Sequence, residues 1–198
     1  MESRRTQAER HAATRAALIG AARQAFAEQG YAATGTEAVV RAAAVTRGAL
    51  YHHFADKAAL FAAVFETVAA EVLAAIEAAA SDAPTAVEAL RLGSEAFLAA
   101  ALSPTIRRIY LIDAPAVIGW AQWREIDGRH AMGSLRRGVE AALAECGRTD
   151  IDPEATTCLL SGALNEAALW LAAADTAEAH ARLRATFRLL LAGLFVRA

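Results

Sequence analysis

The chain has 198 residues and a net charge of −2 at pH 7, with 20 Lys or Arg against 22 Asp or Glu. Alanine accounts for 55 residues and proline for four, and because alanine is the best helix former, the composition predicts an all-α fold. The sequence has no run of about 18 apolar residues and no apolar signal-peptide core near its N-terminus. We therefore expect a cytoplasmic protein without a membrane-spanning segment.

Charge is unevenly distributed along the chain. Residues 1–57 carry eight Lys or Arg against five Asp or Glu, whereas residues 58–198 carry twelve against seventeen. All basic side chains are arginine except Lys57. A positive N-terminal part is the electrostatic pattern of a nucleic-acid-binding protein, despite the negative net charge.

The first predicted helix covers residues 15–29 and ends at Gly30. Its apolar residues recur at helical spacing and predict a buried stripe of Leu18, Ala22, Ala25 and Phe26. Before it, Arg4, Arg5 and Arg10 form a predicted mobile arm. The arm either reaches DNA or is simply solvated, and the sequence leaves both readings open.

Two short helices on either side of a tight turn are predicted within residues 36–57. Thr36 is the expected N-cap of the first, with Glu37 in its first turn, and Thr46 that of the second. Asp56 is the expected N-cap of the following helix, which places Lys57 at a helix start, where backbone N–H groups favour a phosphate.

The second short helix has two chemically different faces. Because a helix repeats about every 3.6 residues, four residues share one side, namely Arg47, Gly48, Tyr51 and His52. Leu50 and Phe54 lie on another side and predict packing against the protein. Arginine can take two acceptors of guanine in the major groove, whereas tyrosine, histidine and backbone N–H groups suit phosphate oxygens. A plain helical hairpin would also bury Leu50 and Phe54, so this face alone does not establish DNA binding.

This segment resembles the helix-turn-helix of TetR-type transcriptional regulators. The resemblance rests on Thr36, on the apolar Val40 and Val45, and on the run TRGALYHHFADK. Residues 18–36 also resemble the first helix and loop of that family, so the match covers about the first third of the chain. The family commonly has glycine before Val45, where this chain has Ala44, and a positive φ there would cost alanine about 1 kcal/mol.

The resemblance implies a three-helix DNA-binding domain at residues 12–57, with its motif at 37–56. A long helix would join it to a larger helical domain, residues 58–198, for effector binding and dimerisation. The implied partners are double-stranded DNA with a near-palindromic operator, an unknown small-molecule effector and a second copy of the chain. The implied function is a repressor. The DNA-contacting residues would be Thr36, Thr46, Arg47, Gly48, Tyr51, His52 and Lys57.

Helical spacing predicts further helices after residue 58, separated by a break at SDAPT. Their expected ranges are 58–80, 86–102, 104–113, 133–146, 154–174 and 177–196. The stretch between residues 113 and 132 is unusual because it holds Pro115, Gly119, Gly128 and two tryptophans. Residues 107–127 weakly resemble the C-terminal domains of some TetR-type regulators.

The last two predicted helices have broad apolar faces. Such a pair at a chain end can pack on its twin as a four-helix bundle, which the resemblance also implies. Both faces could instead belong to the internal core. The residues are Leu159, Leu160, Ala163, Leu164, Ala167, Ala168 and Leu171 on the first helix, and Leu183, Phe187, Leu190, Leu191 and Leu194 on the second.

A ligand pocket needs apolar walls and a few polar anchors. The candidate walls are Phe97, Tyr110, Trp120, Trp123 and Trp170, and the candidate anchors are Asn165 and Glu166, which interrupt an apolar helix. Each aromatic residue is also an ordinary core residue, and the polar pair also suits structural hydrogen bonds or a dimer contact. The tryptophans suggest a planar aromatic effector.

Other classes of function find little support in the sequence. His52 and His53 diverge by about 100° on a helix and do not converge on one metal ion. Cys146 and Cys158 match no CxxC spacing and are expected to be ordinary thiols. We found no G-x-S-x-G, H-E-x-x-H or phosphate-binding G-x-x-x-x-G-K, so we expect neither an enzyme nor a cofactor. A DNA-binding architectural or activator protein without an effector is the alternative.

Overall fold

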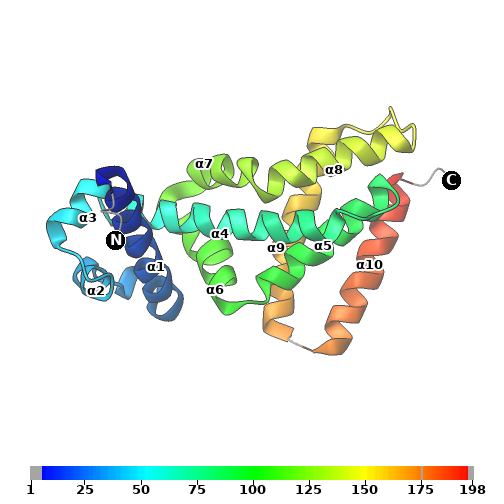
Figure 1. Ribbon diagram of the computed structural model, residues 1–198. Helices are drawn as coiled ribbons and strands as arrows, with labels where there is room; N and C mark the ends of the chain where they lie inside the picture. Colours follow the sequence, from blue (N-terminus) through cyan, green and yellow to red (C-terminus); the bar gives the residue numbers. More distant parts are fainter. Residues whose placement is uncertain (1–5, 175, 196–198) are drawn as a thin grey trace.

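The computed structural model describes residues 6–174 and 176–195, and every regular element within these ranges is helical (Figure 1). The prediction of an all-α fold is confirmed. In chain order the elements are α1 (Gln7–Ala33), α2 (Thr36–Ala42), α3 (Arg47–His53), α4 (Lys57–Ala80), α5 (Ala86–Ala101), α6 (Pro104–Ile106), η1 (Arg107–Asp113), α7 (Ala114–Arg129), α8 (Ala131–Glu145), α9 (Pro153–Ala174) and α10 (Ala177–Phe195).

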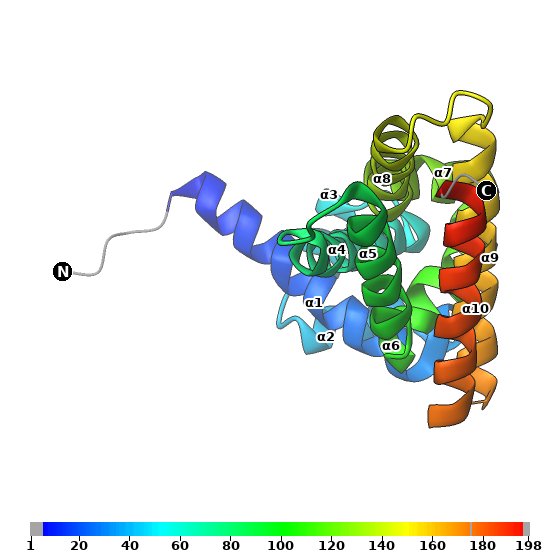
Figure 2. The same ribbon diagram turned by 90° about the vertical axis from the view of Figure 1, so that its right-hand side faces the viewer.

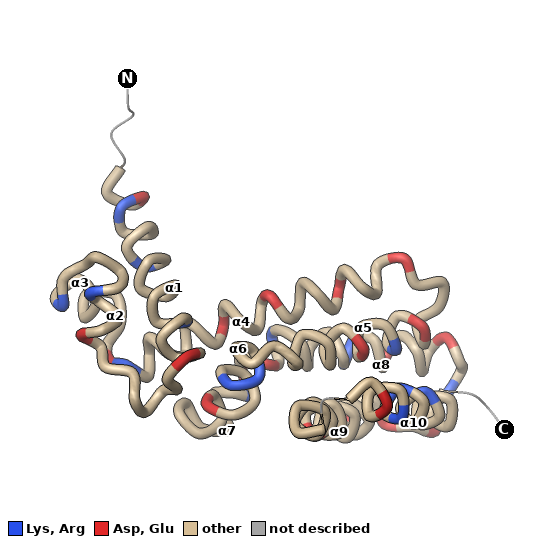
Figure 3. Tube along the Cα trace, turned by 90° about the horizontal axis from the view of Figure 1, so that it is seen from below, with Lys and Arg blue, Asp and Glu red and all other residues tan. Residues whose placement is uncertain are grey.

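A small unit of α1, α2 and α3 forms one end of the molecule, and α4 leads from it into a larger helical unit (Figure 1). The small unit closes around side chains with no exposed surface: Leu18, Ala22, Phe26, Val39 and Leu50. In the larger unit, α4 packs against α5, α7 and α8. The last two helices, α9 and α10, lie side by side along one side of it (Figures 2 and 3).

Helix α1 begins earlier than predicted, at Gln7 rather than Arg15. Thr6 accepts a hydrogen bond from the backbone N–H of Glu9, and the Glu9 carboxylate accepts one from Thr6, which is a capping box. Arg10 therefore lies on a helix and not in a mobile arm, while Arg4 and Arg5 lie outside the described residues. Gly30, with φ +81°, interrupts the helix where its end was predicted.

Thr36 does not cap α2, contrary to the prediction. It is the first residue of the helix, Gly35 occupies the N-cap position, and no side chain caps that end. The two other predicted caps are confirmed. Thr46 Oγ1 accepts from the backbone N–H of Ala49 at 3.1 Å, and Asp56 Oδ1 accepts from that of Ala59 at 2.7 Å.

The turn between α2 and α3 is strained at Ala44. Its φ is +53°, the only positive value among non-glycine residues of the described ranges. The turn therefore does have the positive φ that disfavours alanine here, and the left-handed conformation brings the alanine Cβ close to the following carbonyl oxygen.

We expect Ala44→Gly to stabilise the protein. Removing the Cβ relieves about 1–2 kcal/mol of strain in the folded protein. The greater conformational freedom of glycine in the unfolded chain lowers the free energy of unfolding by roughly 0.4–1 kcal/mol. The net gain in free energy of unfolding should be about 0.5–1 kcal/mol, measured by chemical denaturation. Ala43→Gly, at an αR position, is the matched control and should destabilise. Equal effects of the two substitutions would contradict strain at Ala44.

The segment predicted as one helix over 104–113 consists of a single turn, α6, followed by the π-helix η1. Gly119, with φ +77°, then breaks α7 after its first turn. The π-helical turns of η1 are wider than α-helical turns, and Gly119 interrupts α7. The side chains that follow therefore point in directions that simple helical spacing does not predict.

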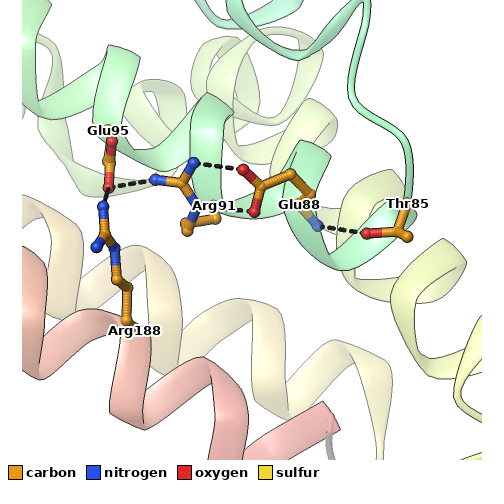
Figure 4. A network of polar contacts seen from close by, with 5 residues as sticks. All are labelled: Thr85, Glu88, Arg91, Glu95 and Arg188. Carbon is orange, nitrogen blue, oxygen red and sulfur yellow. Dashed lines mark hydrogen bonds and ion pairs between the residues drawn. The ribbon is translucent and has the colours of Figure 1, made fainter.

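A network of ion pairs links α5 to α10 (Figure 4). Thr85 caps α5 by accepting from the backbone N–H of Glu88 at 3.1 Å. Arg91 binds Glu88 and Glu95, and its hydrogen bonds with the two carboxylates raise its pKa. Arg188 of α10 lies 3.7 Å from Glu95, so the network reaches across from one helix to the other.

By length and composition alone, α4 and α9 could each cross a membrane, with mean hydropathies of 2.0 and 1.2. Glu66 and Glu71 interrupt α4, and Glu166 interrupts α9, so neither helix contains an uninterrupted run of 18 apolar residues, as expected from the sequence. Helix α4 is the core helix of the fold and is contacted on several sides, which accounts for its apolar composition. Helix α9 instead presents apolar side chains outward, among them Leu159, which is 75% exposed.

Candidate DNA-binding surface and ligand cavity

Helix α3 presents the predicted polar face to solvent. Arg47, Gly48, Tyr51 and His52 are exposed, while Leu50 is completely buried against the small unit. A Cβ at Gly48 would meet only Thr46 Oγ1, at 3.9 Å, so the fold itself does not require a glycine there. The open backbone at Gly48 is therefore available for close approach by a partner.

Arg47 is held only loosely. Its guanidinium lies 3.7 Å from the Glu37 carboxylate and 5.7 Å from the centre of the Tyr51 ring. The Arg47 and Glu37 side chains are 67% and 81% exposed, and exposed pairs of this kind contribute at most about 1 kcal/mol. A stronger acceptor can therefore displace Glu37.

Lys57 begins α4 beside the same surface. Its Nζ lies 4.2 Å from the centre of the Tyr31 ring, so the aromatic face orients the ammonium group. Burial, followed by the nearby Asp56 carboxylate, raises the pKa of Tyr31, which keeps its hydroxyl protonated. Thr36 is half-buried at the start of α2.

Three histidines lie close together where α1 meets α3, a cluster that was not predicted from the sequence. The His11 ring on α1 lies 4.1 Å from that of His53 and 5.7 Å from that of His52. Burial, then the neighbouring His11, His52 and Arg15, lowers the pKa of His53. Within the described residues, no three His, Cys, Asp or Glu side chains are placed to hold a metal ion. The early start of α1 brings His11 here, and the Thr6-x-x-Glu9 pattern was the signal for it.

A cavity of about 360 Å³ lies in the larger unit, among α4, α5, α7, α8 and α9. We call it the central cavity. Its apolar lining includes Ile76, Leu90, Phe97, Met132, Leu135 and Leu164. Glu77 and Arg137 also line it, and because their side chains are more than half exposed, they mark where the cavity meets solvent.

The buried polar lining of the central cavity centres on Asp127, which is 3% exposed. The Tyr110 hydroxyl donates to Asp127 Oδ1, and Arg124 Nη1 lies 3.7 Å from Oδ2. Burial raises the pKa of Asp127. Burial, followed by the Asp127 carboxylate, raises the pKa of Tyr110 well above its usual range, so Tyr110 remains a neutral donor.

Tyr110 belongs to η1, which also holds the end of α1. Arg108 Nη1 donates to the carbonyls of Ala27 and Glu28 at 2.9 and 3.1 Å. The backbone N–H of Tyr31 donates to Asp113 Oδ2 at 3.1 Å, directly after the interruption at Gly30. One turn therefore connects a carboxylate of the central cavity with the helix that carries the small unit.

Comparisons with known proteins agree with this architecture. Residues 18–64 match the family described as bacterial regulatory proteins, tetR family, and residues 87–194 match a tetracyclin repressor-like C-terminal domain. A solved TetR-family transcriptional regulator from Pectobacterium atrosepticum is 40% identical, with 98% of this chain and 99% of that chain covered and a TM-score of 0.76. The chain belongs to the TetR family of transcriptional regulators.

Two solved proteins of lower sequence identity share the fold. The fatty acid degradation regulator FadR from Bacillus halodurans is 18% identical over 98% of this chain and 100% of its own, with a TM-score of 0.74. RolR, solved with resorcinol, is 22% identical over 90% and 87%, with a TM-score of 0.68. No curated protein sequence matches this chain. Members of the family are transcriptional regulators, not enzymes; they bind DNA operators and small-molecule effectors and form dimers.

In this TetR-family protein, only some of the residues predicted to form a ligand pocket line the central cavity. Phe97 and Asn165 line the central cavity. Tyr110 lies behind it, bonded to Asp127, and Trp123 is buried with its indole N–H donated to the Tyr110 carbonyl at 3.0 Å.

Trp120, Glu166 and Trp170 are exposed and do not line the central cavity. Trp120 is 62% exposed and stacks with Trp123 and Arg124. Sequence reasoning missed Asp127, although it follows Trp123 by four residues and so shares a helical face with it.

Proposed function

We propose that this TetR-family protein is a cytoplasmic, homodimeric repressor that a small molecule releases from a near-palindromic operator. Residues 12–57 would form the DNA-binding domain and residues 58–198 the effector-binding and dimerisation domain. The observation that carries the proposal is the η1 connection, because Tyr110 donates to Asp127 of the central cavity while Arg108 and Asp113 hold α1. Occupation of the cavity therefore has a physical route to the DNA-binding surface.

The exposed face of α3 supports DNA binding. Its first turn offers an exposed, weakly paired guanidinium at Arg47 and an open backbone at Gly48. The N-terminal part of a recognition helix is the part that contacts base edges. Tyr51, His52, Thr46 and Lys57 surround it with donors for phosphate oxygens. Thr36, at the start of α2, is the remaining proposed phosphate contact.

The outward faces of α9 and α10 support dimerisation through these helices. Leu159 and Leu189 are 75% and 74% exposed, and Leu190, Trp170 and Leu169 are also exposed. Large apolar side chains gathered on two adjacent helices mark an interaction surface. A two-fold pairing would present two α3 helices, which must lie about 34–36 Å apart to enter successive major grooves.

An effector would act by favouring a subunit arrangement with the wrong spacing. By thermodynamic linkage, operator DNA must then weaken effector binding by the same factor. RolR, which shares this fold, was solved with resorcinol, so a small aromatic molecule is a reasonable first candidate for screening.

The test begins with an operator selected from random DNA by the purified protein. A small-molecule library is then screened by thermal shift, and each hit is tested for release of that operator by fluorescence anisotropy. Hits that stabilise the protein and release DNA are expected. Hits that stabilise it without affecting DNA binding would favour the alternative, a DNA-binding protein that does not respond to an effector.

Lys57→Ala should weaken binding to all DNA sequences alike. The loss of one phosphate contact per subunit should reduce the slope of log affinity against log salt by about one unit per subunit. Anisotropy titrations at several salt concentrations measure this slope, and Lys57→Arg, which keeps the charge, is the control. A change in sequence preference would instead assign Lys57 to base recognition.

A further inference from the structure

Two buried side chains of the central cavity, Ser94 and Asp127, present hydrogen-bond acceptors. The Ser94 hydroxyl donates its hydrogen to the Leu90 carbonyl at 2.7 Å. The Ser94 oxygen can therefore only accept a hydrogen bond from a ligand. Asp127 already accepts from the Tyr110 hydroxyl and from the Met132 backbone N–H, but a carboxylate has about four acceptor sites, which leaves capacity toward the cavity. Both side chains are more than nine-tenths buried.

The charge at Asp127 is already balanced. The Arg124 guanidinium lies 3.7 Å from Asp127 Oδ2 and also donates to Ser161 Oγ at 3.2 Å. Arg124 stacks on Trp120 and Trp123 and does not itself line the cavity, but its guanidinium contacts the lining residues Ser161 and Met132. An anionic ligand would meet the Asp127 carboxylate at low dielectric, and a cationic ligand would find a carboxylate already paired.

The rest of the central cavity is apolar, with Phe97, Leu135 and Leu164 among its walls. Asn165 makes none of the hydrogen bonds found among the described residues, and its amide can serve a second polar group of a ligand. The lining therefore suits a molecule with an apolar body and one or two groups that donate a hydrogen bond.

We propose that the central cavity selects uncharged apolar compounds that carry a hydroxyl group, a phenol or an alcohol, and that the hydroxyl donates to Asp127. This inference rests on the proposed effector-responsive function and adds the chemical class of the effector. It predicts discrimination against carboxylic acids and against ethers, which have no hydrogen to donate.

The test uses three probes of matched size: para-propylphenol, its methyl ether and para-propylbenzoate. Isothermal titration calorimetry and thermal shift on the wild-type protein should show binding of the phenol and at least tenfold weaker binding of the other two. A buried hydrogen bond to a charged group contributes about 1.5–3 kcal/mol, which corresponds to roughly 10- to 150-fold in affinity.

Asp127→Asn should reverse this preference. The asparagine keeps an acceptor for Tyr110 but turns an N–H donor toward the cavity and leaves Arg124 without its counter-charge, so benzoate binding should strengthen while phenol binding weakens. Asp82→Asn, the same change at an exposed residue outside the cavity lining, is the control and should retain the wild-type order. If Asp127→Asn does not fold, the wild-type series decides alone.

Equal or tighter wild-type binding of the ether or the benzoate would overturn the proposed ligand class. Absence of binding by all three probes at millimolar concentration would overturn it as well. Phenol binding without release of the selected operator would leave the ligand class standing and contradict the repressor function.

Discussion

Arg47→Ala is expected to weaken operator binding by about 1–3 kcal/mol in each half-site and to relax the preference at one base position. In the free protein the guanidinium is exposed and only weakly paired with Glu37, so little is lost when it turns toward DNA. A bidentate bond to guanine would replace that pair, and no other basic side chain of α3 can supply it.

The measurement is an anisotropy titration at fixed salt with the selected operator and with single-base variants of it. Arg136→Ala is the matched control, because Arg136 is an exposed arginine on α8 that pairs with Glu140. It should leave operator binding unchanged. If Arg47→Ala keeps the wild-type preference at every base, Arg47 does not read a base.

The double substitution Leu159→Asp with Leu189→Asp is expected to convert the dimer to monomers and to abolish tight operator binding. Both leucines are about three-quarters exposed in the single chain, so the aspartates cost the monomer little, but pairing would bury four carboxylates at the interface. A monomer reaches only one half-site and loses the gain from linked binding, which is about 10²–10⁴-fold.

Analytical ultracentrifugation at micromolar concentration measures the first effect and anisotropy the second. Ala70→Asp, which adds a carboxylate at an exposed position of α4, is the control and should remain dimeric. A double variant that sediments as a dimer would place the interface outside these faces of α9 and α10.

The local structure of the proposed DNA-binding surface was largely predictable because its signals are local. The caps Thr46 and Asp56, the spacing of Leu50 against Arg47 and the turn at Ala44 are each encoded within a few residues. The predicted ranges of α4, α5, α9 and α10 were correct to within a few residues for the same reason. The start of α1 was missed although its capping box is also local.

The ligand cavity was not predictable in the same way because tertiary contacts decide it. Tryptophans were expected to form its walls, but Trp120 stacks on Arg124 at the surface. The buried acid is Asp127, whose place depends on Tyr110 seventeen residues earlier. The π-helix η1 carries Arg108 and Asp113, which bind α1. Such a long-range contact leaves no periodic pattern in the sequence, so it could not be predicted.

The placement of η1 separates chemical recognition from signal transmission. The side chains that would meet an effector belong to α5, α7 and α9, among them Ser94, Asp127 and Asn165. The groups that hold α1, Arg108 and Asp113, belong to η1 and do not line the cavity. Substitutions at Ser94 or Asn165 should therefore retune which compound is sensed while the output is preserved, which makes this protein a suitable scaffold for biosensors with exchangeable inputs.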